Sequence, residues 1–215
     1  MTKKIKIELP KMASELEKVN FQDIYYEEDP ELVNCMVLGA RVDNEVIEKA
    51  IFSKVIFKNV TFINATFNNI DMTDVIFENC NLSNARLCGG IIHRVVFKDC
   101  KLLGLDFSEA NLGNVSFENC DVNLSNFADA RLKQVSFDQS SLSSANFYNC
   151  KLSKVYFNRC DINDINLTQT NLKGIDISTC TFEQLNVSLE SLNGCEVSKD
   201  QAIGFSKLLG LKVKE

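Results

Sequence analysis

A five-residue period runs through this sequence from Ala50 to Leu189 without an insertion or deletion, over 28 consecutive units. The third residue of every unit is apolar, and 13 of the 15 phenylalanines occupy that position. The first residue is small or apolar, and the other three are mostly polar. A fold for this chain must therefore send the first and third side chains of every unit to the same buried side.

Neither an α-helix nor a flat strand meets that requirement. Residues five apart on a helix are rotated by about 140°, so the apolar set would spread around the whole circumference. Along a flat strand, the third residues of successive units would point to opposite faces. A chain that turns a corner every five residues does satisfy the pattern, which predicts an all-β solenoid.

A second period, of twenty residues, sets the size of one coil. Units of the form Val-x-Phe recur at this spacing, beginning at Val55, Val75, Val95, Val115, Val135 and Val155. Four units therefore make one square coil, and the run holds seven coils. Stacked at an inter-strand spacing of about 4.8 Å, they form a rod about 34 Å long. Inside it we expect Phe97, Phe117 and Phe137 to lie directly over one another.

Three units share one consensus: Ala110-Asn-Leu-Gly-Asn, Cys80-Asn-Leu-Ser-Asn and Thr170-Asn-Leu-Lys-Gly. They resemble the pattern Ala-(Asp/Asn)-Leu-x-x of pentapeptide repeat proteins. The resemblance implies a right-handed quadrilateral β-helix, which we place at residues 50–197. This motif is very specific for the fold and carries almost no information on function.

Residues 1–49 lie before the regular run and are expected to supply an N-terminal cap and an irregular first coil. Apolar side chains at the open end of a solenoid need such a cover. A short helical turn is expected at residues 14–19. The five-residue register is already visible near Cys35, but Glu45 at an inward position predicts an imperfect coil.

Residues 198–215 are expected to form a short C-terminal α-helix followed by a strand, both used for dimerisation. Ser198 followed by Gln201 predicts a capping box, and Gly210 marks the end of a helix of about three turns. After it, two apolar residues alternate with lysines, as in an edge strand. This much apolar surface at the end of an open rod favours a two-fold homodimer. The expected interface residues are Leu192, Val197, Phe205, Leu208, Leu209, Leu211 and Val213.

Within the repeat family, the chain is most similar to Qnr-type proteins, which protect DNA gyrase and topoisomerase IV from quinolone drugs. The similarity lies in the rod length, in the run at residues 192–197 and in the tail at residues 201–211. It implies a homodimeric rod that resembles duplex DNA in width and charge. Qnr proteins of Gram-negative bacteria have loops that bulge from the coils, whereas the unbroken register here leaves room for none. The resemblance is therefore to the loop-free members of Gram-positive bacteria.

Net charge and hydropathy restrict the class of partner. The formal charge is −6 and the isoelectric point is near 5.0, so we expect no direct nucleic-acid binding, which normally requires a basic protein. No apolar run of 18 residues exists and the first residues lack a signal-peptide core, so a cytoplasmic protein with no membrane association is expected.

The register assigns each charged residue to one of four faces. Formal charges sum to −2, −2 and −3 on three faces and to +5 on the fourth, which is basic toward its C-terminal half. An acidic side would fit the positively charged groove in which a topoisomerase holds DNA. The alternative is that charges of both signs simply keep a rod soluble. Candidate partner-binding acids are Glu78, Asp99, Asp106, Glu109, Glu118, Asp121, Asp129 and Asp138.

Catalysis, cofactors and metal binding are not expected. Eight of the nine cysteines fall on the inward first position, where they act as small buried hydrophobes, and Cys88 alone should face outward. Disulfides along the cysteine column are disfavoured because parallel side chains and a reducing compartment both oppose them. His93 is the only histidine, and paired acids on a convex rod have no pocket around them, so neither a metal centre nor an enzyme is predicted.

Two functions from different classes remain open at this point. The first is a cytoplasmic, DNA-mimicking protein that binds DNA gyrase or topoisomerase IV and protects it from quinolones. The second is a structural or scaffold module that uses the same rod to bind a different bacterial protein. The sequence separates them only through the family resemblance.

Overall fold

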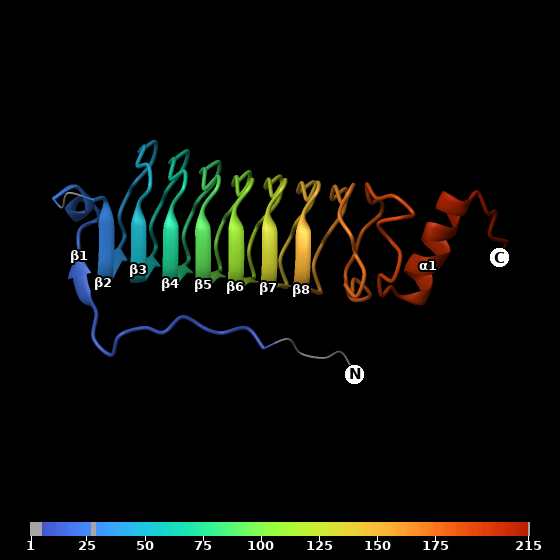
Figure 1. The fold of residues 1–215 in the computed structure, drawn as a ribbon, viewed down its shortest axis with the longest axis horizontal. Coiled ribbons are helices and arrows are strands. Elements are labelled where there is room, and N and C mark those ends of the chain that lie inside the picture. The colour runs from blue at the N-terminus through green and yellow to red at the C-terminus, as the bar shows by residue number, and fades with distance from the viewer. Residues whose placement is uncertain (1–5, 27–28, 215) are drawn as a thin grey trace.

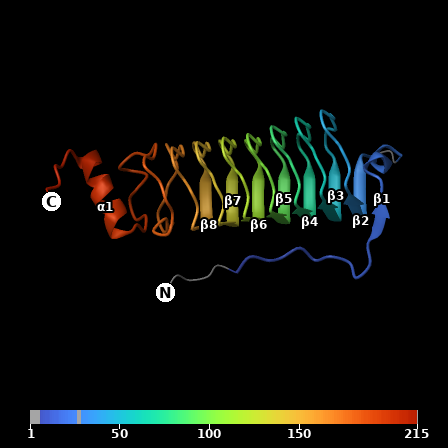
Figure 2. The same ribbon diagram turned by 180° about the vertical axis from the view of Figure 1, so that it is seen from behind.

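Residues 6–26 and 29–214 are described by the computed structural model, and they form a rod of stacked coils (Figures 1 and 2). Eight parallel strands follow one another along the rod in sequence order. From β2 onward, each strand pairs with the next at a spacing of twenty residues, as in Val75 with Val95. The strands are β1 (Glu17–Val19), β2 (Glu31–Leu38), β3 (Ile51–Lys58), β4 (Asp71–Glu78), β5 (Ile91–Lys98), β6 (Asn111–Glu118), β7 (Arg131–Asp138) and β8 (Lys151–Asn158). The all-β solenoid with a twenty-residue coil is confirmed.

The corners of the coil are visible in the backbone. Every fifth residue from Asn34 to Gly174 has a positive φ, between 50° and 76°. Asparagine and glycine, which tolerate this left-handed conformation best, are frequent at these positions. Four such residues per twenty give four corners per coil. The regular corners begin before Ala50, so the coil that precedes the regular run is more regular than its sequence suggests. They end before Leu189, so the last coil of the run is less regular than its sequence suggests.

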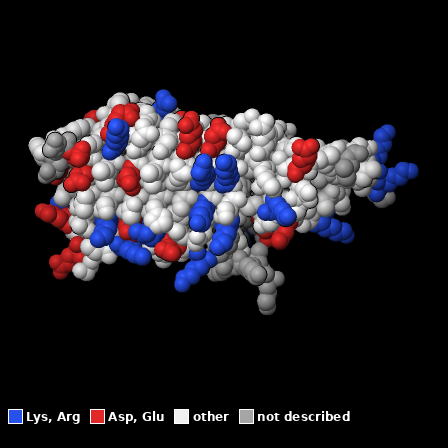
Figure 3. Space-filling model, in the orientation of Figure 1, with Lys and Arg blue, Asp and Glu red and all other residues white. Residues whose placement is uncertain are grey.

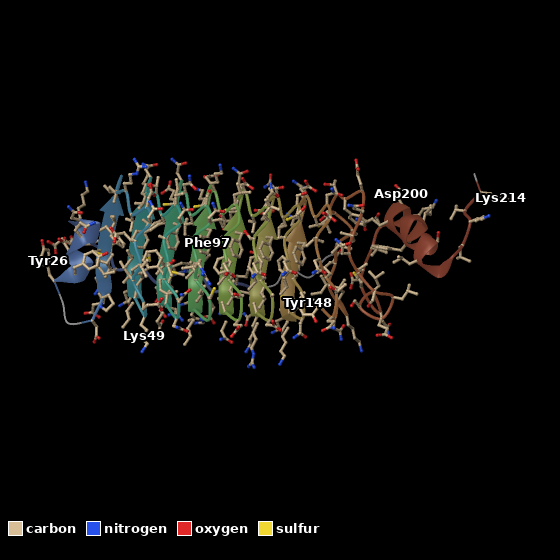
Figure 4. All side chains as sticks on the ribbon, turned by 90° about the horizontal axis from the view of Figure 1, so that it is seen from above. Tyr26, Lys49, Phe97, Tyr148, Asp200 and Lys214 are labelled. Carbon is tan, nitrogen blue, oxygen red and sulfur yellow. The ribbon has the colours of Figure 1, made fainter. Side chains whose placement is uncertain are left out.

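Phenylalanine side chains fill the interior as stacked columns. Along one face, the rings from Phe57 to Phe157 lie 4.6–5.2 Å apart and nearly parallel. Phe97, Phe117 and Phe137 are fully buried and lie over one another, as expected. Figure 4 shows Phe97 inside the rod. The inward orientation of the third position is therefore confirmed.

The N-terminal end is plugged by a 3-10 helix, η1 (Phe21–Tyr25). The Phe21 side chain is 1% exposed, and its ring lies 5.9–6.5 Å from the four phenylalanine rings of one coil, residues 50–69. The helical turn expected at residues 14–19 is wrong, because residues 17–19 are strand β1 and pair with β2. The helix at this end begins later, at an Asn20 capping box.

Residues 6–16 form an extended arm that runs back along the side of the rod (Figure 1). Lys11 N–H donates to Asp74 Oδ1 at 2.8 Å, and Glu8 N–H donates to Asn114 Oδ1 at 3.0 Å. Gln134 Nε2 donates to the Lys6 carbonyl at 3.2 Å. The arm therefore contacts one edge of the rod over several coils, which the sequence did not predict.

The C-terminal end carries α1 (Lys199–Phe205), followed by a 3-10 helix, η2 (Ser206–Leu209). The predicted capping box of Ser198 and Gln201 is present, and Gly210 has a φ of 70° where the helix ends. Gln201 Nε2 also donates to the carbonyls of Ile177 and Cys180, which anchors the helix on the last regular coil. Residues 211–214 belong to no strand of the described chain, so their strand pairing stays a prediction for the dimer.

Candidate partner-binding surface

Four of the eight predicted acids lie along one edge of the rod, which we call the acidic edge: Asp99, Glu118, Asp121 and Asp138. Glu118 on β6 and Asp138 on β7 are direct register partners, so their carboxylates stack one coil apart. Asp121 follows Glu118 around the corner formed at Asn119, where φ is 52°. Asp99 occupies the same corner one coil earlier and accepts a hydrogen bond from Asn119 Nδ2 at 2.7 Å.

Neighbouring groups hold these carboxylates in place without neutralising them. Ser116 Oγ donates to Glu118 at 3.2 Å, and Asn158 Nδ2 donates to Asp138. Among the described residues, none of the four acids forms an ion pair. Lys98 and Lys101 lie one coil toward the N-terminus, as register partners of Glu118 and Asp121. The acidic edge therefore presents uncompensated charge mainly on its C-terminal side.

Glu109 and Asp129 lie on the diagonally opposite edge of the square coil. Both are exposed corner residues with φ of 60°, twenty residues apart, and Asp129 accepts a hydrogen bond from Asn149 Nδ2 at 2.6 Å. A single flat partner cannot contact both edges. The eight predicted acids are therefore not one binding surface.

Glu78 and Asp106 are compensated within the chain. Lys58 Nζ lies 3.1 Å from Glu78 Oε2, and Arg86 Nε lies 3.9 Å from Asp106 Oδ2. Burial alone would raise the pKa of Asp106, but hydrogen bonds from Cys88 and Ser108 outweigh it and lower that pKa. Because each of these two acids is paired with a cation of the same chain, they attract a positively charged partner less than the four unpaired acids of the acidic edge do.

A buried ion pair that the sequence reading missed lies where the arm meets the rod. Arg94 donates to Asp74 through Nε at 2.6 Å and through Nη2 at 2.8 Å, and the Asp74 side chain is only 5% exposed. The Arg94 hydrogen bonds, together with the one from Lys11 N–H, lower the pKa of Asp74 despite its burial. The twenty-residue spacing could have revealed this pair. The arm that covers this ion pair lies outside the five-residue repeat, so the repeat pattern could not have revealed it.

The predicted dimer residues divide into two groups. Leu192, Val197 and Phe205 are half-buried against the core of their own chain, and the Phe205 ring lies 5.7 Å from the ring of Phe182. They border a shallow apolar cavity of about 280 Å³ at the end of the rod. The exposed members are Leu208 (45%), Leu211 (57%) and Val213 (58%). The side chain of Leu209 lies outside the described part of the chain.

The nine cysteines are free thiols, and those on the inward position are buried or half-buried. Cys88 is half-buried on the outside and donates to Asp106 Oδ2 at 3.0 Å. Within the described residues, no cluster of histidine, cysteine and acidic side chains is suited to hold a metal ion. In the same part of the chain, no helix has the length and hydropathy that a membrane crossing requires.

Family models account for most of the rod. The model for pentapeptide repeats in nine copies matches residues 46–86, and the model for the pentapeptide repeat region matches residues 90–167, together more than half of the chain. The chain belongs to the pentapeptide repeat family. No curated protein matches the sequence of this pentapeptide repeat protein.

Solved pentapeptide repeat proteins match the chain at low sequence identity. HetL, involved in heterocyst differentiation regulation in the cyanobacterium Nostoc sp. strain PCC 7120, is 15% identical, with 79% of this chain and 90% of HetL covered and a TM-score of 0.50. A trypsin-treated variant of QnrB1, a plasmid-mediated fluoroquinolone resistance protein, is 18% identical, with 85% and 99% covered and a TM-score of 0.38. Rfr23 from the cyanobacterium Cyanothece 51142 is 17% identical, with 60% and 87% covered and a TM-score of 0.34.

Proposed function

We propose that this pentapeptide repeat protein is a cytoplasmic homodimer that binds DNA gyrase or topoisomerase IV through its acidic edge and protects the enzyme from quinolones. The observation that carries the proposal is the stack of Glu118 on Asp138 with Asp121 beside it, on a straight rod without loops between residues 31 and 174. Such an edge offers a line of negative charge to a positively charged DNA-binding groove. No enzymatic role is proposed for the chain.

The sequence of the C-terminus supports this choice among repeat-protein functions. The fold alone does not select a function, because HetL and Rfr23 are solenoids of the same family. Residues 192–197 and 201–211 resemble the ends of Qnr-type proteins. Here the capped helix α1 (Lys199–Phe205) lies in the second of these segments and is anchored through Gln201 on the carbonyls of Ile177 and Cys180. Two rods joined at these ends would be one long rod with two acidic edges.

The proposal predicts that the purified protein restores supercoiling by DNA gyrase in the presence of ciprofloxacin. Reversing the two stacked charges with Glu118→Lys and Asp138→Lys should raise the concentration needed for protection about tenfold, equivalent to about 1.4 kcal/mol. The matched control is Glu109→Lys with Asp129→Lys, which makes the same charge change on the opposite edge and should leave protection nearly unchanged.

Two results would reject this assignment. The first is the absence of protection at every concentration tested. The second is equal loss in both double variants, because that would show a dependence on total charge and not on the acidic edge. Recovery of a different bacterial protein and no topoisomerase subunit in a pull-down would favour the scaffold function instead.

Dimerisation has its own test. Leu208 is 45% exposed on the short helical end of the chain, so Leu208→Asp should remove apolar contact from the interface and yield a monomer of 24.2 kDa. Light scattering after a sizing column measures the mass. Val46→Asp is the control, since Val46 is 68% exposed at the other end of the rod. A monomeric wild-type protein at micromolar concentration would contradict the expected dimer.

A further inference from the structure

The C-terminal half of one face of the rod carries cations without acids. It comprises the five-residue units 110–114, 130–134, 150–154 and 170–174, which lie on four successive coils and which we call the basic face. These twenty residues include no aspartate or glutamate. In Figure 3, lysine and arginine side chains gather near the middle of the rod, while acids dominate its N-terminal end. The cations of the basic face are Arg131, Lys133, Lys151, Lys154 and Lys173.

All five cations are exposed, although the arm lies along one edge of the face, at Asn114 and Gln134. Arg131 and Lys151 are register partners on β7 and β8, so two like charges stack one coil apart. No ion pair or side-chain hydrogen bond engages any of the five within the described residues. Like charges at this spacing repel each other. An anionic partner that spans several coils would relieve that repulsion.

The remaining residues of the face decide which kind of anion fits. Its outward positions hold only cations, small residues and amides, such as Asn111 and Ser153, with no exposed apolar or aromatic side chain. Protein interfaces have apolar and aromatic centres and are depleted in lysine, whereas interfaces with DNA are polar and strongly basic. Lys, Arg, Ser, Asn and Gln are the side chains that contact phosphate and sugar.

We propose that the basic face binds the phosphate backbone of duplex DNA. A duplex carries one negative charge per about 1.7 Å of axis, so four coils spanning about 15–20 Å meet several phosphates at once. Single strands are usually held on aromatic platforms, which this face lacks. A flat membrane surface would meet Glu109 and Asp129 on the adjoining edge as well as the cations.

This proposal goes beyond the topoisomerase function and does not depend on it. It departs from the expectation, drawn from a net charge of −6, that the chain binds no nucleic acid directly. Exposed charges are screened beyond about 8–10 Å at physiological salt, so a local group of five cations acts on a nearby phosphate more strongly than the acids at the N-terminal end of the rod do. Without base-reading contacts, the binding is expected to be weak, in the range of about 1–100 µM, and independent of DNA sequence.

The experiment measures fluorescence anisotropy of a labelled 20-base-pair duplex with the full-length protein between 50 and 200 mM NaCl. Five phosphate contacts predict a slope of log K against log salt near −4.5. The triple variant Arg131→Gln, Lys151→Gln, Lys154→Gln should bind at least tenfold more weakly at 50 mM salt, with a slope near −2. The matched control, Lys18→Gln, Lys49→Gln, Lys101→Gln, removes three exposed cations from other faces and should bind like the wild type.

Three outcomes would overturn the proposal. The first is no binding of the duplex at 50 mM NaCl. The second is equal weakening by the triple variant and by its control. The third is tighter binding of phosphatidylglycerol vesicles or of polyglutamate than of the duplex, with the same loss in the triple variant, because the face would then serve a membrane or an acidic protein. Circular dichroism and thermal melting of both triple variants exclude misfolding as the cause of lost binding.

Discussion

Replacing Phe117 with alanine will lower the free energy of unfolding by about 3–5 kcal/mol. Phe117 is fully buried, and its ring is stacked between Phe97 at 5.0 Å and Phe137 at 4.6 Å. The inner side chains above and below it belong to rigid coils that hydrogen-bond to each other, so they cannot collapse into the space left by the ring. Urea denaturation followed by circular dichroism measures the loss.

The control for this substitution lies in the same chain. Phe182 occupies the equivalent third position of its unit but is half-buried at the C-terminal end, where regular corners have ceased. Phe182→Ala should therefore cost clearly less than Phe117→Ala. Equal losses would mean that the interior is not packed as a continuous column, and they would contradict the fold described here.

The second large effect is expected at the arm. Asp74→Ala will leave the Arg94 guanidinium without its carboxylate and destabilise the protein by about 3–5 kcal/mol, the usual cost of breaking a buried ion pair. It also removes the acceptor of Lys11 N–H, so trypsin should cleave the arm after Lys11 faster than in the wild type. Glu78→Ala is the control, because the Glu78–Lys58 pair is more exposed and should contribute about 0–1 kcal/mol.

The same pair predicts how arm attachment depends on pH. Hydrogen bonds from Arg94 keep the pKa of Asp74 in the folded protein below its value in the unfolded chain, which is about 3.9. A group with a lowered pKa stabilises the folded state fully above the unfolded value and loses that contribution as the pH falls through the folded value. Cleavage at Lys11 by an acid-tolerant protease should therefore accelerate only below about pH 4. Acceleration near neutral pH would contradict this account.

Most of the rod could be predicted because the same five-residue pattern repeats along it. The third position of each unit is apolar throughout, so the inward direction of Phe97 or Leu112 follows from its number alone. The end segments follow no such rule. Residues 14–19 had a weak helical pattern, yet β1 forms there because the unpaired edge of β2 offers hydrogen bonds to any adjacent extended segment.

The candidate surface was predictable in part. The twenty-residue grid places Glu118 beside Asp138, and it also places Glu78 beside Lys58, so ion pairing within the chain was accessible from sequence. The arm contacts were not. Glu8 reaches Asn114 and Lys11 reaches Asp74, at sequence separations of 106 and 63 residues, through backbone groups that every residue carries. Because every residue except proline carries a backbone N–H, the identity of Glu8 or Lys11 does not indicate that its N–H makes such a contact.

The arm also sets a geometric limit on the rod. Between Lys11 and Glu8 the chain has three residue steps, which span about 10 Å when extended, and their acceptors Asp74 and Asn114 are two coils apart, about 9.6 Å. The two lengths match, so both hydrogen bonds of the arm can form only while its two acceptors are two coils apart. Duplicating or deleting one coil between these acceptors would change their separation, so the arm could no longer make both hydrogen bonds. The number of coils in this segment is therefore tied to the length of the extended arm, which belongs to none of them.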